Sequence, residues 1–167
     1  MAFFLIVSSL CAFSSEKRED SLLQVLQHQK DTARINTLLD LAWYYNYRSP
    51  EKAKQMATTA MEESIAINYE TGTEKAHRRL ADYYRKKNKY SQAQEHLIEA
   101  LRIAEKSGDT LASLKTLVGL GNLYFNIDDN DKALHYYEKS LGLTEKIEDP
   151  KYLAIVCNNL AQVYETT

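Results

Sequence analysis

Apolar residues recur with helical spacing along most of the chain, and one arrangement returns about every 40 residues. Four blocks, LAWYY, LADYY, LGNLY and LAQVY, begin at Leu41, Leu80, Leu120 and Leu160, so that their spacings are 39, 40 and 40 residues. Each block has a large apolar residue, then a small one, then a tyrosine three residues beyond the small one. On a helix the leucine and the tyrosine share one face, and the small residue lets a neighbouring helix approach closely. The blocks therefore predict four equivalent helices.

A second apolar stripe follows each of the first three blocks after a short polar turn. Its members lie at offsets of 4, 7, 8 and 11 residues, which form one face of an α-helix and do not fit a strand. The three stripes are Ala53, Ala57, Ala60, Met61 and Ser64, then Ala93, Leu97, Ala100, Leu101 and Ala104, and then Ala133, Tyr137, Ser140, Leu141 and Thr144. The pattern predicts an all-α fold, an α-α superhelix (solenoid) of antiparallel helix pairs.

Turn and cap residues set the expected boundaries. Ser49-Pro50, Asp149-Pro150 and Asp129 are suited to helix N-termini, and Gly72 and Gly108 are expected just after long second helices. The expected organisation is a signal peptide over residues 1–14, an N-terminal helical segment over 15–33, repeats over 34–71, 72–109 and 110–149, and the first helix of an incomplete repeat over 150–167.

The combined pattern resembles the tetratricopeptide repeat (TPR). The closest unit, LGNLYFNIDDNDKALHYYEKSL, has Leu120, Gly121, Tyr124, Ala133 and Tyr137 at the signature positions, with Ser140 replacing the usual alanine. The resemblance covers about residues 34 to 167, although the family's usual period is about 34 residues. The longer units are similar to those of kinesin light chains and to the exported sensor arm of bacterial TPR-containing histidine kinases or transcriptional regulators. This resemblance implies a scaffold that binds proteins or peptides.

Composition and charge narrow the function further. A net charge of -2, with 26% charged residues and no long basic run, argues against a general nucleic-acid binder. The run MAFFLIVSSLCAFSS is too short to cross a membrane comfortably but matches the apolar core of a secretory signal, with cleavage expected after Ser14. The alternative is a buried or interfacial N-terminal helix. Cys157 is expected to be a buried apolar residue.

Catalytic and metal-binding patterns are missing from the sequence. His28, His77, His96 and His135 have no partner at ligand spacing, so each is expected at the surface or a flank. The acidic run 128–131 lacks the glycine and the final glutamate of a calcium loop, which favours a capping turn. The tyrosines at repeat positions, Tyr45, Tyr84, Tyr124, Tyr137 and Tyr164, are expected in the core. We expect no enzyme activity and no cofactor or metal.

The concave face of such an array is lined by the first helix of each unit. The candidate groove residues are Trp43, Lys75, Arg78, Asp82, Lys115, Asn122, Phe125, Asn158 and Asn159, accompanied by Asn36, Leu39, Asn46, Arg85, Val118, Ile155 and Gln162. The asparagine amides both donate and accept hydrogen bonds, as an extended peptide backbone requires. The basic side chains suit a carboxylate or an acidic segment. The alternative is a solvated helix face without a partner.

Three functional hypotheses follow. The first is a non-enzymatic interaction scaffold forming the N-terminal part of a larger exported or membrane-anchored signalling protein that faces the periplasm. The second is a ligand-sensing arm that regulates a histidine kinase or another output enzyme beyond Thr167, and the third is a stand-alone cytoplasmic adaptor. Because the last block ends without a second helix, its stripe of Leu153, Val156, Leu160, Val163 and Tyr164 is expected to lack a packing partner, and any membrane segment is expected downstream.

Overall fold

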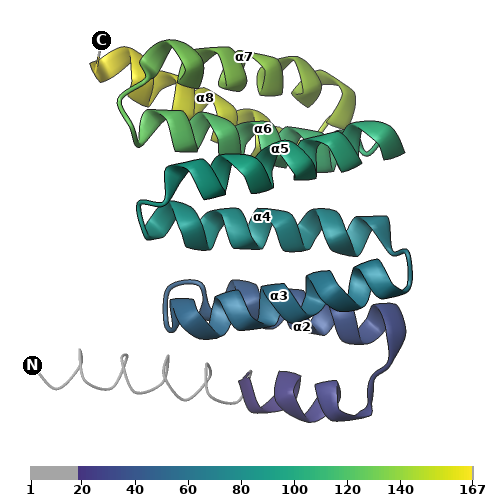
Figure 1. The fold of residues 1–167 in the computed structure, drawn as a ribbon. Helices are drawn as coiled ribbons and strands as arrows, with labels where there is room; N and C mark the ends of the chain where they lie inside the picture. Colours follow the sequence, from purple (N-terminus) through teal and green to yellow (C-terminus); the bar gives the residue numbers. More distant parts are fainter. Residues whose placement is uncertain (1–18, 167) are drawn as a thin grey trace, which may run out of the picture.

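The computed structural model describes residues 19–166, so the expected signal peptide lies outside the described residues. Helical residues 19–28 precede α2 (Asp31–Tyr45), α3 (Pro50–Ala66), α4 (Glu70–Lys86), α5 (Tyr90–Ser107), α6 (Thr110–Phe125), α7 (Asn130–Ile147) and α8 (Pro150–Thr166). Figure 1 shows these helices stacked from the N-terminal helices at the bottom of the view to α7 at the top, with α8 beside α6 and α7 at the upper end. No strand occurs between residues 19 and 166, and the predicted all-α solenoid is confirmed.

The predicted stripes form the core of the stack. Each stripe lies on the second helix of a pair and faces the first helix. In this way α3 packs on α2, α5 on α4 and α7 on α6. All stripe residues are buried except Met61, Leu101 and Leu141, which are half-buried at the edge. At the lower end, Leu22 and Leu26 pack against the buried Tyr45 and its neighbours. No helix within the described range is both long and apolar enough to span a membrane.

Each pair closes at one small residue of its first helix. In the first pair Ala42 lies in a cluster with Ala57, and in the second Ala81 lies in a cluster with Leu97. In the third pair Gly121 faces the ring of Tyr137, and a Cβ atom added at Gly121 would overlap that ring. The expectation that Gly121 serves packing inside a helix is confirmed.

The helix caps agree with the sequence at Asp129, Asp149 and Gly108, whereas Ser49 precedes α3 without a side-chain cap hydrogen bond and Asp109 caps α6 without having been predicted. The Asp109 carboxylate accepts a hydrogen bond of 2.9 Å from the Ala112 amide, and the Asp129 carboxylate accepts one of 3.2 Å from the Lys132 amide. Gly108 ends α5 in the left-handed conformation, with φ +70. These caps satisfy backbone groups that a helix end leaves unpaired.

The expectation for Gly72 is wrong. Gly72 lies inside α4, where it is buried against Ser64 and Tyr69. The left-handed residue after α3 is Asn68, with φ 56, forty residues before Gly108. Asparagine tolerates this conformation better than other residues with a side chain, so the cap did not need a glycine.

Burial along α8 differs from the expectation for two side chains. Val156 and Val163 are fully buried, whereas Cys157 is exposed and Tyr164 is 60% exposed. The equivalent positions of α6, Leu117 and Tyr124, are buried. The reason is that α7 packs on α6, whereas within residues 19–166 no later helix covers the corresponding face of α8.

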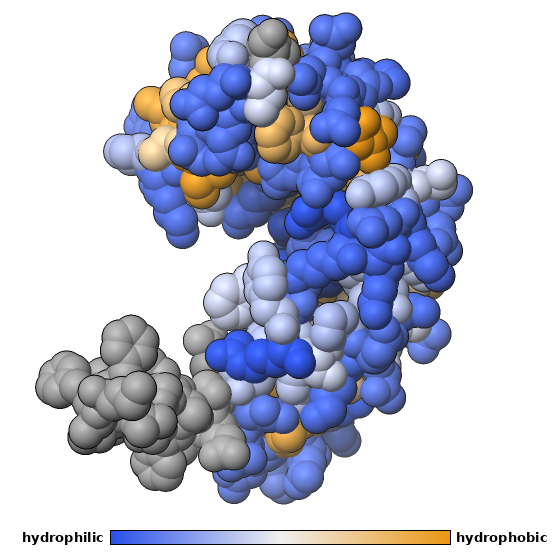
Figure 2. All heavy atoms as spheres, turned by 90° about the vertical axis from the view of Figure 1, so that its left-hand side faces the viewer, coloured by the Kyte–Doolittle hydropathy of each residue, from blue (hydrophilic) through white to orange (hydrophobic). Residues whose placement is uncertain are grey.

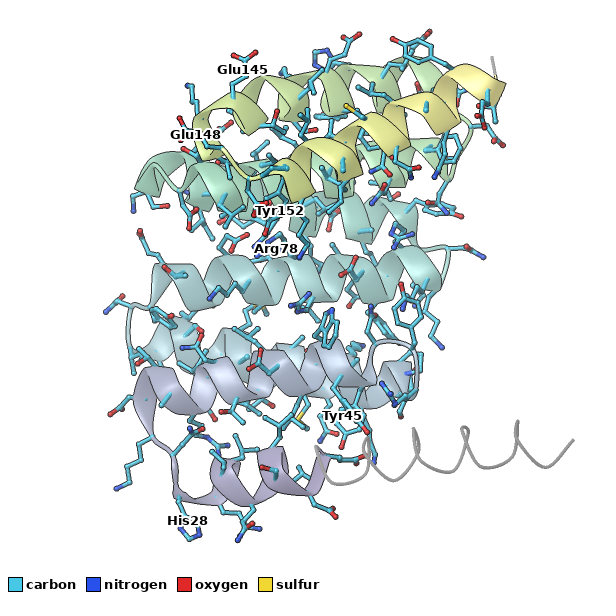
Figure 3. All side chains as sticks on the ribbon, turned by 180° about the vertical axis from the view of Figure 1, so that it is seen from behind. His28, Tyr45, Arg78, Glu145, Glu148 and Tyr152 are labelled. Atoms are coloured by element: carbon cyan, nitrogen blue, oxygen red, sulfur yellow. The ribbon has the colours of Figure 1, made fainter. Side chains whose placement is uncertain are left out.

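Glu148 lies at the turn between α7 and α8 (Figure 3), at the position equivalent to Gly108 in the preceding unit. Its backbone is left-handed, with φ 53. A side chain with a Cβ atom is strained in this conformation, and glycine is not. We predict that Glu148→Gly raises the free energy of unfolding by about 1 kcal/mol. Gly108→Ala is predicted to lower it by a similar amount. Urea denaturation monitored by circular dichroism measures both, and equal stability of Glu148→Gly and wild type would contradict the assignment.

Candidate partner-binding groove

The candidate groove residues lie on the first helices of the units. Helices α2, α4, α6 and α8 contact one another in that order. Figure 2 shows that the molecule curves around a hollow between its upper and lower ends, and the surface around the hollow is mainly hydrophilic. Trp43 and Asn158 are exposed, whereas the other candidates, Lys75, Arg78, Asp82, Lys115, Asn122, Phe125 and Asn159, are half-buried. Leu39 is only 3% exposed, so it belongs to the core and not to the groove.

Arg78 is held by a buried acid. Its guanidinium forms an ion pair with the carboxylate of Glu74, which lies one turn earlier on α4 and is only 2% exposed. Thr116 of α6 also donates to this carboxylate, at 3.5 Å. Since a buried carboxylate needs its counter-charge, Arg78 primarily neutralises Glu74 and fixes α4 beside α6. The sequence pattern did not indicate this, because glutamate is rarely buried.

Asn122 joins three helices. Its side-chain oxygen accepts hydrogen bonds from the Tyr137 hydroxyl of α7 at 2.7 Å and from the Asn159 amide of α8 at 3.4 Å. Burial raises the pKa of Tyr137 to about 12, so the hydroxyl remains a donor at neutral pH. The Asn122 oxygen is therefore used inside the fold, and Asn158, which is exposed, is the asparagine best placed for a partner.

Several cations of this face rest against aromatic rings or amides. Lys115 lies 5.4 Å from the centre of the Tyr152 ring, and Figure 3 shows Arg78 and Tyr152 in the space between α4 and α8. Lys86 lies 3.2 Å from the centre of the Tyr47 ring. The Arg85 guanidinium donates to the Asn126 side chain at 3.4 Å. Lys86 also donates to the Asn46 carbonyl at 2.7 Å, and Arg85 lies 3.8 Å from the Asp82 carboxylate, so of these three cations Lys115 keeps the most donors for an anion.

Arg79 was not among the sequence candidates. Its Nε atom is buried without a hydrogen-bond partner among the described residues. Burial lowers the pKa of Arg79, and the neighbouring Arg78 lowers it further, whereas Asp82 and Asp40 act in the opposite direction. A buried guanidinium donor without an acceptor is costly, so an oxygen acceptor brought to this atom would stabilise the side chain. The available sequence signal was the repeat register, since Asp40 and Gly119 occupy the equivalent positions.

A histidine pair was also missed. His77 of α4 and His96 of α5 are half-buried, and their Nδ1 atoms lie 2.8 Å apart, so that one ring donates a hydrogen bond to the other. The His96 ring also stacks on Tyr84 at 5.3 Å between centres. The equivalent residues of the next unit are Leu117 and Tyr136. The expectation that these two histidines are unpaired surface residues is therefore wrong.

The histidine pair predicts an acid-sensitive fold. Burial and the neighbouring His77 lower the pKa of His96 from 6.5 to about 4, and burial also lowers the pKa of His77. The unfolded chain therefore binds protons more tightly, and stability present above the ordinary pKa of 6.5 is lost as the pH falls toward 4. We predict a loss of about 1 kcal/mol between about pH 7 and pH 5, a modest value because half-exposed rings are screened by solvent.

The double variant His77→Leu with His96→Tyr copies the equivalent residues of the next unit and serves as the control. It retains the helix packing but removes the titrating contact, so its stability is predicted to fall less over the same pH range. Thermal melts of both proteins at each pH measure the difference. Parallel pH dependence of the two proteins would contradict a role for this pair.

Metal coordination finds no support in the described range. No group of three or more histidine, cysteine, aspartate or glutamate residues suited to a metal ion occurs between residues 19 and 166. The candidate groove residues carry guanidinium and ammonium groups, amides, aromatic rings and the carboxylate of Asp82.

Comparisons with known proteins agree with this architecture. Residues 72–146 match the family model of the tetratricopeptide repeat, and no curated protein matches the chain. BtubC (BKLC) from P. vanneervenii is similar in structure with a TM-score of 0.78 and 21% identity, over 91% of this chain and 66% of that chain.

Two further solved structures have the same helical arrangement. One is a signal transduction ATPase with numerous domains, with a tetratricopeptide repeat sensor, from Pyrococcus horikoshii; its TM-score is 0.77 at 20% identity, over 91% of this chain and 24% of that chain. The other is the apo form of RapI, with a TM-score of 0.73 at 16% identity, over 93% of this chain and 56% of that chain. At these identities the likeness shows the fold, and the chain spans less than two thirds of each of these structures.

Proposed function

We propose that this chain, whose residues 72–146 belong to the tetratricopeptide repeat family, is a non-enzymatic scaffold that binds an extended segment of a partner protein in its groove. Repeats of this family bind proteins or peptides, and the all-helical fold is typically not catalytic. The observation that best supports the groove is Arg79, whose buried donor lacks an acceptor on the face that also presents Trp43 and Asn158.

The chemistry of this face favours an acidic partner segment. Arg79, Lys75 and Lys115 supply positive charge along α4 and α6, whereas Arg78 is largely neutralised by Glu74 and Arg85 lies 3.8 Å from the carboxylate of Asp82. A carboxylate of the partner completes the hydrogen bonding of Arg79, and the exposed Asn158 amide is suited to a peptide backbone. The exposed Trp43 adds apolar contact area at the other end of the groove.

For the wider context, we propose that the chain is the N-terminal, exported arm of a membrane-anchored bacterial signalling protein facing the periplasm. The apolar run at residues 1–14 supports export. The ATPase from Pyrococcus horikoshii, in which a repeat of this family is a sensor, favours the related hypothesis of a ligand-sensing regulatory arm. A stand-alone cytoplasmic adaptor is the remaining alternative, and N-terminal sequencing of the expressed protein distinguishes it, because an adaptor retains residues 1–14.

The groove is tested with two labelled peptides of equal length, one alternating glutamate with apolar residues and one in which glutamine replaces every glutamate. We predict that the acidic peptide binds more tightly, because only it supplies carboxylates. Arg79→Ala is predicted to lower the affinity for the acidic peptide about tenfold, which is the effect of losing one hydrogen bond to a charged group. Fluorescence anisotropy measures the affinities, and Asn158→Ala is predicted to weaken both peptides.

The matched control is Arg102→Ala, because Arg102 lies on α5 and is already paired with Glu99 at 2.5 Å. This variant is expected to bind both peptides as wild type does. Arg78 and Asn122 are unsuitable test positions, since their removal would leave Glu74 or Tyr137 without a partner inside the fold. Equal binding of the two peptides, or unchanged binding by Arg79→Ala with an unaltered melting curve, would refute the proposed groove.

A further inference from the structure

The 40-residue period also produces a series of equivalent clefts on the side of the second helices. One cleft is lined by Thr73 and His77 of α4 with Glu99 and Ile103 of α5, and the next by residues 40 positions later in α6 and α7. Each has a floor formed by a first helix and walls formed by the second helices on either side. These clefts share no lining residue with the candidate groove.

The cleft between α5, α6 and α7, here called the outer cleft, differs from its counterpart in having an apolar interior. Its volume is about 410 Å³, within the range of small-molecule sites. Its floor and walls include Leu117, which is 6% exposed, with the half-buried Leu101, Tyr136 and Leu143. The Tyr136 ring is held in place by stacking on Tyr124 at 5.4 Å between centres.

The counterpart cleft is less apolar, although Ile65 and Ile103 line it. His77 occupies the position that Leu117 has in the outer cleft. The charged residues of the counterpart cleft are already paired. Glu99 binds Arg102 at 2.5 Å, and Glu70 binds Lys106 at 2.5 Å. A ligand there would have to break existing ion pairs.

The polar groups of the outer cleft are available. Glu105 of α5 and Lys139 of α7 line opposite walls, and neither forms an ion pair with a residue between 19 and 166. The hydroxyls of Thr110 and Ser113, on the α6 floor, likewise have no hydrogen-bond partner in the described range, although Ser113 is only 7% exposed. The cleft therefore combines an apolar interior with one anion, one cation and two hydroxyl groups.

We propose that the outer cleft binds a small zwitterion with a large apolar side chain, of the chemical class of a free aromatic or branched amino acid. The apolar side chain lies against Leu117 and Tyr136, the ligand carboxylate faces Lys139, and the ligand ammonium group faces Glu105. Two opposite unpaired charges around an apolar cleft complement a zwitterion better than a purely apolar molecule.

The proposal is tested by titrating the full chain with L-phenylalanine, 3-phenylpropionate and 2-phenylethylamine while recording amide NMR spectra. L-phenylalanine is expected to bind most tightly and to shift amides in residues 101–117 and 136–143. Lys139→Ala is expected to lower the affinity for L-phenylalanine and for 3-phenylpropionate about threefold. The affinity for 2-phenylethylamine is expected to stay unchanged. Glu105→Gln is expected to weaken the two amines and to leave 3-phenylpropionate unchanged.

The matched control is Glu99→Ala, since Glu99 is the repeat equivalent of Lys139 and lies in the other cleft. It is expected to bind all three probes as wild type does. Leu143→Trp fills the outer cleft and is expected to abolish the shifts. The proposal is overturned if saturating L-phenylalanine leaves residues 101–117 and 136–143 unshifted, or if the three probes bind equally well.

Discussion

The close approach of two helices at one small residue is the constraint on which the whole array depends. The facing side chain of the second helix grows from Ala57 to Leu97 to Tyr137. The first helix presents Ala42 and Ala81 to the two smaller side chains and Gly121 to the tyrosine. This complementarity keeps the separation of the helices similar from one unit to the next, because protein interiors tolerate neither voids nor overlaps. Equivalent positions then recur in equivalent places, and the groove and the clefts are consequences of that regularity.

A regular framework allows the chemistry of each unit to differ. The position held by Arg79 is Asp40 in the preceding unit and Gly119 in the following one, so of these three positions only Arg79 carries a guanidinium group. The third unit has Leu117 and Tyr136 where the second unit has His77 and His96. An apolar cleft wall therefore takes the place of a titrating contact. Substitutions in a repeated register therefore give the second unit both a basic position, Arg79, and a titrating contact between His77 and His96, whereas the third unit has an apolar cleft wall at the equivalent of that contact.

The fold was predictable from sequence because it depends on local periodicity. The stripes of α3, α5 and α7 and the packing role of Gly121 follow from spacing alone. The placement of candidate residues on α2, α4, α6 and α8 follows from the same register.

Contacts between side chains on different helices were not predictable in the same way. The links from Thr116 to Glu74 and from Asn122 to Tyr137 depend on distances across the stack, which no sequence spacing specifies. The exposure of Cys157 depends on which helices surround α8. Aligning the units at their 40-residue period would have shown that His77 and His96 replace a contacting apolar pair, since Leu117 and Tyr136 occupy the same places.

The most direct test of the small-residue constraint is the stability of Gly121→Ala, measured by urea denaturation beside Gly142→Ala. Gly142 lies in α7 with open space around it, so alanine there should raise the free energy of unfolding by about 1 kcal/mol through helix propensity. At Gly121 the same gain is outweighed by overlap with Tyr137, so a net loss of about 1–2 kcal/mol is expected, and Gly121→Ala is expected to cost less when it is made in a Tyr137→Leu background. Equal stabilisation by both alanine substitutions would contradict the account.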